Sequence, residues 1–399
     1  MINFEHASQL IKKEFLDLNI DTEYVKLEDA LNRTLAENIF ADVNLPSFNN
    51  SAVDGIAISF YENIRKWEIS DEVSAGNYFD ISKGESVLIM TGAKLPAQFD
   101  TVIPLEDYTV TDNKARLNDN IIIRKGINIR PKASDVAAGD LVVKQNSFLS
   151  PRNIAAIAAC GKSNLNVYKK LNIGILATGD ELIPIEEKPT RDKVRVSNNY
   201  GLTSAVQSVF QNGFNHGYVN DDYNIAKEKI KKIMESDIDI IITTGGVSVG
   251  KYDYVREIFN ELGVEEIFWR ANIKPGKPAF FGKNTNGEKI KLIFGLPGNP
   301  VSCMVNFDVY IKPNISARFG LNQQTRIKAT LVNDIRKKDS KRHFVRGEIN
   351  HINGNYSVTS QLSQSSGNLV QFSSSNCLIE LSEEVRNPQK GALVECILI

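Results

Sequence analysis

The sequence predicts a multidomain α/β protein, in which one domain with a mostly parallel sheet is accompanied by smaller β-rich domains. Three observations lead to this fold class. The chain has 399 residues, which is too long for one ordinary hydrophobic core. Apolar runs alternate with helical patterns over residues 171–320, as in successive β-α-β units. Short strand patterns without long helices occupy residues 45–140 and 321–399, and they indicate two separate β domains.

The remaining residues, 1–44 and 141–170, are expected to form an N-terminal scaffold of helices and strands on either side of the inserted β domain. Apolar side chains at helical spacing predict a helix over residues 4–18, with Asn3 as its N-cap. A helix rich in alanine is expected over residues 154–159, capped by the stretch from Ser150 to Asn153. We interpret this domain as a support for the others.

The inserted β domain, residues 45–140, is predicted from short apolar stretches between glycine-containing turns. We expect strands at residues 56–60, 87–90, 101–104 and 121–123. Asp54 and Asp135 lie in loops of this domain. An aspartate in a Ser- and Asn-rich loop commonly bonds its own backbone, so a turn or capping role is the simpler local interpretation of both.

Acidic side chains follow three of the strands expected in the α/β domain. The apolar run over residues 238–242, interrupted only by Asp239, indicates a strand buried on both faces, as in a parallel sheet. The carboxyl ends of parallel strands meet at one edge, where ligands bind in open α/β sheets. The acidic residues after these strands are Asp180, Glu181, Asp221, Asp222 and Asp253. Converging like charges need a cation or ligand, so we predict a site here, although any single carboxylate is commonly structural.

Glycine- and proline-containing turns in the same domain predict an anion site. Gly245 and Gly246 let the backbone turn and approach a ligand closely, and their amides with the Ser248 hydroxyl suit an anion. Lys274 and Lys277 lie on a loop stiffened by proline, where an ammonium suits an oxyanion. A plain turn after a strand explains Gly-Gly equally well, and this alternative stays open.

Composition excludes several classes of protein. The 47 Lys and Arg residues are balanced by 48 Asp and Glu, whereas a general nucleic-acid binder has a basic excess. No apolar run approaches the length of a membrane span, and the N-terminus lacks the apolar core of a signal peptide. The 4 cysteines are scattered without a C-x-x-C pair, so neither a zinc site nor a disulfide framework is indicated. We expect a cytoplasmic protein with no nucleic-acid or membrane partner.

Seven motifs, taken in this order, resemble the MoeA/gephyrin family of molybdopterin molybdenumtransferases. They are FNNSAVDG, MTGAKLP, SDVAAGD, ATGDEL, TTGGVSVGKYD, IKPGKP and GLPGNPVS. The resemblance covers essentially the whole chain, and it implies an α/β domain of the molybdopterin-binding type. It also implies an elongated homodimer of four-part subunits, with transient contacts to the adenylyltransferase of the preceding step and to recipient molybdoenzymes.

The resemblance implies a reaction in which molybdate enters the dithiolene of adenylylated molybdopterin, Mg²⁺ assists hydrolysis of the phosphoanhydride, and AMP leaves. The matching polar active-site positions are Asp54, Thr91, Asp135, Glu181, Asp221 and Asp253, of which the last three are the expected metal ligands. The positions expected to bind the cofactor precursor are Thr178, Gly179, Asp180, Ser197, Asn198, Gly245, Gly246, Ser248, Pro297 and Pro300. Those that match the molybdate pocket are Lys274, Lys277, Pro278, Ser302, Arg342 and Ser366.

The chain departs from the usual family pattern in its inserted β domain. Asn49, Val53 and Ile56 stand where Asp, Met and Tyr are common, and residues 132–135 read Lys-Ala-Ser-Asp where Gly-Glu-Asp is typical. Two other functions stay open: a non-catalytic scaffold of the kind gephyrin provides for receptor peptides, and the preceding adenylyltransferase. The adenylyltransferases usually read TTGGTG before a Pro-Arg-Asp segment, whereas TTGGVSVGKYD resembles the branch that inserts the metal.

Overall fold

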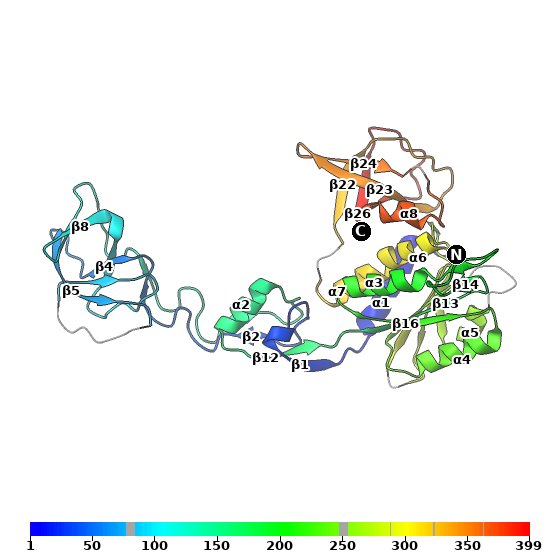
Figure 1. Cartoon of the computed structure of the whole chain (residues 1–399), viewed down its shortest axis with the longest axis horizontal. Helices are drawn as coiled ribbons and strands as arrows, with labels where there is room; N and C mark the ends of the chain where they lie inside the picture. The colour runs from blue at the N-terminus through cyan, green and yellow to red at the C-terminus, as the bar shows by residue number, and fades with distance from the viewer. Residues whose placement is uncertain (77–83, 247–253, 288, 322–323, 362) are drawn as a thin grey trace.

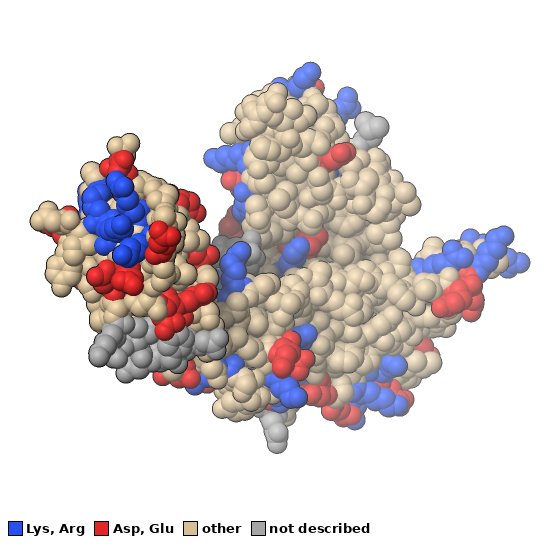
Figure 2. All heavy atoms as spheres, turned by 60° about the vertical axis from the view of Figure 1, so that its left-hand side comes forward, with Lys and Arg blue, Asp and Glu red and all other residues tan. Residues whose placement is uncertain are grey.

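The computed structural model of the chain describes all residues except 77–83, 247–253, 288, 322–323 and 362. The molecule is elongated, with a β-rich part at one end and the α/β and C-terminal parts at the other (Figure 1). The predicted fold class is confirmed, whereas the residue bounds assigned to the four domains stay predictions. Basic and acidic side chains are interspersed over the face in Figure 2, in keeping with the near-neutral charge. Within the described residues, no helix has both the length and the apolar character that crossing a membrane requires.

The first helix, α1 (Phe4–Asp17), begins where the sequence predicts. The Asn3 side chain accepts a hydrogen bond from the backbone N–H of His6 at 2.8 Å, which satisfies one of the unpaired amides of the first turn. Its buried face consists of Phe4, Ala7, Ile11 and Phe15, which pack into the main core of the α/β part. The first helix therefore contributes to the α/β core as well as leading into the scaffold.

Two antiparallel strand pairs join the segments that flank the inserted β-rich part. They are β1 (Thr22–Lys26) with β12 (Asn164–Tyr168), and β2 (Ile39–Phe40) with β11 (Leu141–Val143). A short helical turn, η1 (Leu27–Asp29), follows β1. The predicted alanine-rich helix is α2 (Pro151–Ala159), which begins three residues earlier than expected, and Ser150 caps it together with Asn153. These elements share one small apolar cluster and form the narrow middle of the molecule (Figure 1).

The inserted part contains a six-stranded sheet with the strand order β7-β4-β6-β5-β9-β8. Its strands are β4 (Gly55–Ile58), β5 (Lys66–Val73), β6 (Ser86–Ile89), β7 (Thr101–Pro104), β8 (Tyr108–Thr111) and β9 (Lys114–Leu117). A turn, η2 (Leu105–Asp107), follows β7, and β3 (Asn50–Ser51) pairs separately with β10 (Ile129–Arg130).

The strand predicted at residues 121–123 is wrong. The Ile121 N–H donates to the Asn118 carbonyl in a turn, and the Arg65 guanidinium lies 3.3 Å from the Ile121 carbonyl oxygen. A neighbouring strand would need these backbone groups, and here a turn and a side chain occupy them. Residues 121–123 therefore have the amino-acid composition of a strand, but no neighbouring strand among the described residues pairs with them.

The α/β part is built on a sheet with the order β16-β13-β17-β21-β20-β18. Its strands are β13 (Asn172–Thr178), β16 (Asn212–Val219), β17 (Ile240–Thr244), β18 (Glu265–Trp269), β20 (Phe280–Asn284) and β21 (Lys291–Leu296). The first four strands in this order are parallel, and β20 and β18 add two antiparallel strands. The predicted mostly parallel sheet is thus confirmed.

Helices cover both faces of this sheet, which explains the unbroken apolar run in β17. Ile240 and Ile242 face one cluster with α1 and the helices α3 (Asn198–Ser208), α6 (Pro300–Asn306) and α7 (Lys312–Arg318). Ile241 faces the other cluster, with α4 (Tyr223–Met234) and α5 (Val255–Glu261). A π-helical segment, η3 (Phe307–Ile311), lies between α6 and α7, and short strands β14 (Leu182–Ile183) and β15 (Val194–Arg195) pair beyond the sheet.

The C-terminal part is a closed barrel, because β25 pairs with both β26 and β23. Its strands are β22 (Arg326–Leu331), β23 (Arg342–Ile352), β24 (Asn355–Ser360), β25 (Cys377–Leu381) and β26 (Leu393–Leu398). The short helix α8 (Leu369–Ser373) lies before β25. Strand β19 (Ile273–Lys274) comes from the α/β segment but pairs in parallel with β23, so the two parts are joined by backbone hydrogen bonds.

Candidate functional site

A cavity of about 630 Å³ opens where β13, β17 and β21 end at the carboxyl edge of the parallel sheet. Several residues predicted from the sequence line it, namely Thr178, Glu181, Ser197, Asn198, Gly245, Gly246 and Pro300. Gly367 and Leu369 reach the same cavity from the C-terminal part. Ligands bind at this edge in open α/β folds, since loops from different strands meet there.

Two glycines let the loops of this cavity pack without a gap. Gly245 has a φ of +89°, and a Cβ on it would lie 2.3 Å from the Thr178 carbonyl oxygen. Gly246 has a φ of +63°, and its Cβ would lie 2.5 Å from a methyl group of Val255. No L side chain fits at either position, so the glycine pair is required by backbone conformation and by close approach together.

The cavity wall contains buried polar atoms that lack a partner. The Asn198 amide nitrogen donates to the Gly298 carbonyl at 2.8 Å, which ties the start of α3 to the loop after β21. The Asn198 Oδ1 and the Thr244 Oγ1 are buried, and neither has a hydrogen-bond partner among the described residues. A buried polar atom without a partner is costly, so both atoms are suited to contacts with a polar ligand.

The carboxylates at this edge differ in their surroundings. The Asp180 Oδ1 accepts a hydrogen bond from the Asp221 N–H at 2.9 Å, and the Tyr254 hydroxyl donates to the Asp221 Oδ1 at 2.9 Å. Burial, together with the bond to Asp221, raises the pKa of Tyr254, so this phenol stays protonated. Gly179 links the same loops, because its N–H donates to the Val219 carbonyl at 3.1 Å.

Glu181 is the predicted acidic residue that lines the cavity, and its carboxylate has no hydrogen bond or ion pair with the described residues. Within those residues, no three His, Cys, Asp or Glu side chains gather in a way that would hold a metal. Mg²⁺ in phosphate-handling sites is typically held by one or two carboxylates plus substrate oxygens, so an uncommitted Glu181 fits that ion. The predicted residues Asp253 and Ser248 lie outside the described residues.

The residues predicted for a molybdate pocket gather around the start of α6. Ser302 lies in its first turn, and the Val301 N–H donates to the Ser366 carbonyl at 3.0 Å. The loop that carries Lys274, Lys277 and Pro278 packs on the same helix through Gly276, and Pro297 ends the strand before it. The Lys274 ammonium lies 3.6 Å from a carboxylate oxygen of Asp339.

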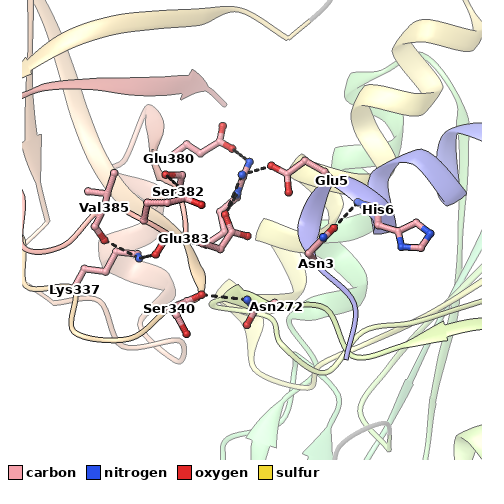
Figure 3. Close-up of polar contacts among 12 residues, drawn as sticks. Asn3, Glu5, His6, Asn272, Lys337, Ser340, Glu380, Ser382, Glu383 and Val385 are labelled. Atoms are coloured by element: carbon pink, nitrogen blue, oxygen red, sulfur yellow. Dashed lines mark hydrogen bonds and ion pairs between the residues drawn. The ribbon is translucent and has the colours of Figure 1, made fainter.

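Arg342 is placed differently from the rest of that group. Its guanidinium binds Glu380 at 2.7 Å and Glu383 at 3.1 Å, and it also pairs with Glu5. Figure 3 shows these three carboxylates turned toward one point between α1 and the C-terminal part. Arg342 is therefore committed to joining these parts, and a contact with an oxyanion would have to displace a carboxylate.

Sequence reasoning missed Arg346, which is only 1% exposed. Its guanidinium donates to the Ser363 carbonyl at 2.8 Å and the Asn368 carbonyl at 3.3 Å, and its Nε lies 3.4 Å from the Gln364 Oε1. It thereby holds the loop whose Gly367 lines the cavity. The sequence feature that could have identified Arg346 is a charged residue within the apolar pattern of β23. A buried arginine must have hydrogen-bond partners, so such a residue is expected to hold a neighbouring segment.

The remaining predicted residues are paired with one another in the β-rich part. The Asp54 Oδ1 accepts hydrogen bonds from the Thr91 N–H at 2.6 Å and from its hydroxyl at 2.8 Å. These two bonds, the backbone one first, lower the pKa of Asp54. Asp135 forms an ion pair with Arg130 at 2.7 Å.

The departures from the family pattern are accommodated locally. Asn49 Oδ1 accepts a hydrogen bond from the Lys132 N–H at 2.8 Å, which is a contact that an aspartate oxygen would also make. Val53 packs at the edge of one apolar cluster, and Ile56 is fully buried in another. Asn49, Val53 and Ile56 therefore each have packing or hydrogen-bond partners, and these contacts hold the loop that contains Asp54.

One chain does not bring all of the predicted residues together. The loops with Asp54 and Asp135 belong to the β-rich part, and the cavity lies in the α/β part at the opposite end of the molecule (Figure 1). This separation agrees with the sequence, which places Asp54 and Asp135 in the inserted β domain and the carboxylates of the sheet edge in the α/β domain.

Three family models match successive segments of the chain. The MoeA N-terminal region (domain I and II) matches residues 2–161, a probable molybdopterin binding domain matches residues 174–317, and the MoeA C-terminal region (domain IV) matches residues 328–399.

Similar proteins match over nearly the full length. The molybdopterin molybdenumtransferase of Haemophilus influenzae is 32% identical over 390 residues, covering 96% of this chain and 95% of that protein. The protein of the same name from Bacillus subtilis is 29% identical, covering 95% of this chain and 90% of that one. The crystal structure of the molybdopterin biosynthesis MoeA protein from Pyrococcus horikoshii OT3 superposes with a TM-score of 0.83 at 28% identity, covering 100% of both chains. The chain belongs to the MoeA family.

Proposed function

We propose that this chain is a molybdopterin molybdenumtransferase, which inserts molybdenum from molybdate into adenylylated molybdopterin and releases AMP. Full-length similarity to proteins of that name supports the proposal. The observation that carries it is the cavity at the sheet edge, where the Asn198 Oδ1 and the Thr244 Oγ1 are buried without partners. A ligand with many polar groups, such as a pterin linked to a nucleotide by a pyrophosphate, suits such a wall.

In this proposal the cavity holds the pyrophosphate end of the substrate. Gly246 lines the cavity, where the absence of a side chain lets an anion approach the backbone closely. The Gly245 amide, which the sequence predicted as a second donor, already donates to the Leu296 carbonyl at 3.0 Å. Glu181, with Asp221 and Asp253, would hold Mg²⁺, which offsets the charge of the pyrophosphate when it is bound. Tyr254 supports this arrangement by fixing the Asp221 carboxylate with its hydroxyl.

The molybdate end is proposed to face the start of α6. Lys274, Lys277 and Pro278 approach it on one loop, and Ser302 and Ser366 lie beside it. Ammonium and hydroxyl groups are suitable donors to a tetrahedral oxyanion. Asp339 pairs with Lys274 in the structure, so this carboxylate helps to hold the ammonium in place.

We further propose a homodimer in the cytoplasm, in which the β-rich part of one subunit completes the cavity of the other. The support is the distance between the two predicted groups within one chain, seen in Figure 1. The four cysteines, all within the described residues, are buried free thiols, as is usual in a reducing compartment. A solution mass of one chain in a fully active sample would contradict the dimer. Transient contacts with the adenylyltransferase and with recipient molybdoenzymes belong to the same proposal.

The direct test supplies purified protein with adenylylated molybdopterin, molybdate and Mg²⁺, and measures AMP and active cofactor. We expect both products, and AMP release that depends on molybdate. If neither AMP nor cofactor forms, the proposed function is wrong and a non-catalytic scaffold is favoured. Incorporation of AMP from ATP would instead favour the adenylyltransferase reaction.

A further inference from the structure

The loop that carries Lys274 and Lys277 is fixed at its two ends. The Ala271 N–H donates to the Lys277 carbonyl at 3.1 Å, and the Arg270 N–H donates to the Ala279 carbonyl at 2.9 Å. These bonds close the base of the loop. Its first part is held by β19, because Ile273 and Lys274 pair with β23, so the middle that still needs a partner is residues 275–277.

Asn306, the last residue of α6, lies under that middle. It is fully buried, and its amide nitrogen donates to the Gly276 carbonyl at 3.3 Å and to the Ser302 carbonyl at 2.8 Å. Gly276 has a φ of +100°, and a Cβ on it would lie 2.2 Å from the Asn306 amide nitrogen. One side chain thus connects the centre of the lysine loop with the first turn of the helix.

We propose that Asn306 is a positioning residue that sets the place of Lys277 relative to Ser302, while the pairing of β19 with β23 places Lys274. The amide cannot reach both carbonyls unless the loop lies flat on α6, so the loop position follows from this contact. Asn306 has no contact with substrate in this proposal and acts only through the loop. The inference rests on the proposed function in one respect, because it takes the lysine loop to be the side that receives molybdate.

The chain contains a matched control for this side chain. Asn314 is also buried, and its amide nitrogen donates to the Tyr310 carbonyl at 2.6 Å, four residues earlier, as Asn306 does to Ser302. Asn314 has no described bond to the lysine loop. Comparing Asn306→Ala with Asn314→Ala therefore separates loss of the loop contact from loss of an amide bond within a helix.

We expect Asn306→Ala to raise the KM for molybdate by about two- to tenfold, the range for one lost hydrogen bond, with kcat nearly unchanged. Asn314→Ala should lower the melting temperature without that KM change. In a Gly276→Ala background, Asn306→Ala should have a smaller effect than in the wild type, because it removes the atom that the new Cβ meets. Equal molybdate KM values for the two alanine variants would overturn the inference.

Hydrogen exchange separates failure of this inference from failure of the proposed function. Backbone amides of residues 276–279 should exchange faster in Asn306→Ala than in Asn314→Ala, and this measurement requires no activity. If wild-type protein releases no AMP, the proposed function fails, and exchange alone decides the role of Asn306. If exchange in this loop is the same in both variants, Asn306 does not position it. Should Asn306→Ala not fold, Asn306→Ser replaces it in both measurements, because a serine hydroxyl can donate to a carbonyl of its own helix but is too short to reach Gly276.

Discussion

Asp54 in the β-rich part and Asp308 in the α/β part carry the same side chain, but their pKa values shift in opposite directions. Asp54 is exposed, and hydrogen bonds from the Thr91 backbone and hydroxyl lower its pKa. Asp308 is buried in the π-helical segment, and burial raises its pKa to about 6, although Lys312 lies 3.9 Å away. Hydrogen bonds from Thr91 favour the charged form of Asp54, whereas loss of contact with water favours the neutral form of Asp308.

The predicted site residues differ between the two regions in the same way. In the β-rich part, Asp54 is bonded to Thr91, and Asp135 to Arg130, so the polar groups already have partners. At the sheet edge, the Glu181 carboxylate and the Thr244 Oγ1 have none among the described residues. The α/β part therefore offers open positions for a ligand, and the β-rich part offers a prearranged polar surface that would approach from another subunit.

The most direct test of whether the two regions form one site across subunits is to mix two inactive variants. Asp54→Asn and Glu181→Gln should each reduce AMP release on the order of a hundredfold or more, since each removes one side of the composite site. A mixture that exchanges subunits should recover about a quarter of wild-type activity, because half of the dimers are mixed and each has one intact site. The measurement is the AMP release rate after co-expression.

A control mixture of Glu181→Gln with Asp221→Asn should recover little activity, because both residues are proposed to hold Mg²⁺ in the α/β part, and no mixed dimer then has an intact site. If mixing Asp54→Asn with Glu181→Gln restores nothing, the two regions do not share a site across subunits.

A second test divides the α/β edge itself into a cation side and an oxyanion side. Glu181→Gln should weaken the response of AMP release to Mg²⁺ and leave the apparent molybdate affinity near the wild-type value. Lys277→Ala should do the reverse, and should lower molybdate affinity about ten- to a hundredfold, the range for one lost charge-assisted contact. Titrations of activity against Mg²⁺ and molybdate measure both effects. Equal shifts in both titrations for both variants would mean one coupled network.

The buried carboxyl of Asp308 provides a test of stability. Its raised pKa favours the protonated form in the folded state, so the free energy of unfolding falls as pH rises from about 4 to about 6. Asp308→Asn removes that cost, and should stabilise the protein at pH 7.5 by about 1–3 kcal/mol. At pH 4 the variant and the wild type should be nearly equal. Urea unfolding at both pH values measures the difference, and stabilisation that is independent of pH would contradict the role of ionisation.

The smallest expected effect concerns Thr91. Thr91→Val keeps the backbone N–H that donates to Asp54 but removes the hydroxyl, so the pKa of Asp54 should rise part of the way toward its usual value. If ionised Asp54 is needed, activity should be lost at a higher pH than in the wild type as the solution is acidified. The pH profile of kcat/KM measures this shift. Thr111→Val, on the exposed strand β8, is the matched control and should leave the profile unchanged.

Features that depend on neighbouring residues were predictable from the sequence. The capping side chains of Asn3 and Ser150 act within one helical turn. The apolar run in β17 indicated burial on both faces, because successive side chains of a strand point to opposite sides. The edge where ligands would bind also followed, since parallel strands carry their loops to one side.

Features that depend on distant partners required the tertiary structure. Arg342 and Arg346 both lie on β23, yet one binds Glu5 and Glu380 and the other holds the loop before α8. The sequence could not distinguish them, because those partners come from separate segments.

By itself, the sequence determined the alternation of strands and helices over residues 171–320, the family, and the types of side chain available for chemistry. Only the tertiary structure decided which of these side chains meet. Glu181 reaches the cavity, whereas Asp54 directly precedes β4, which lies in the β-rich part at the other end of the molecule (Figure 1). The physical reason is range: helix caps and strand patterns are set by contacts over a few residues, but the meeting of two loops depends on how whole parts of the chain pack.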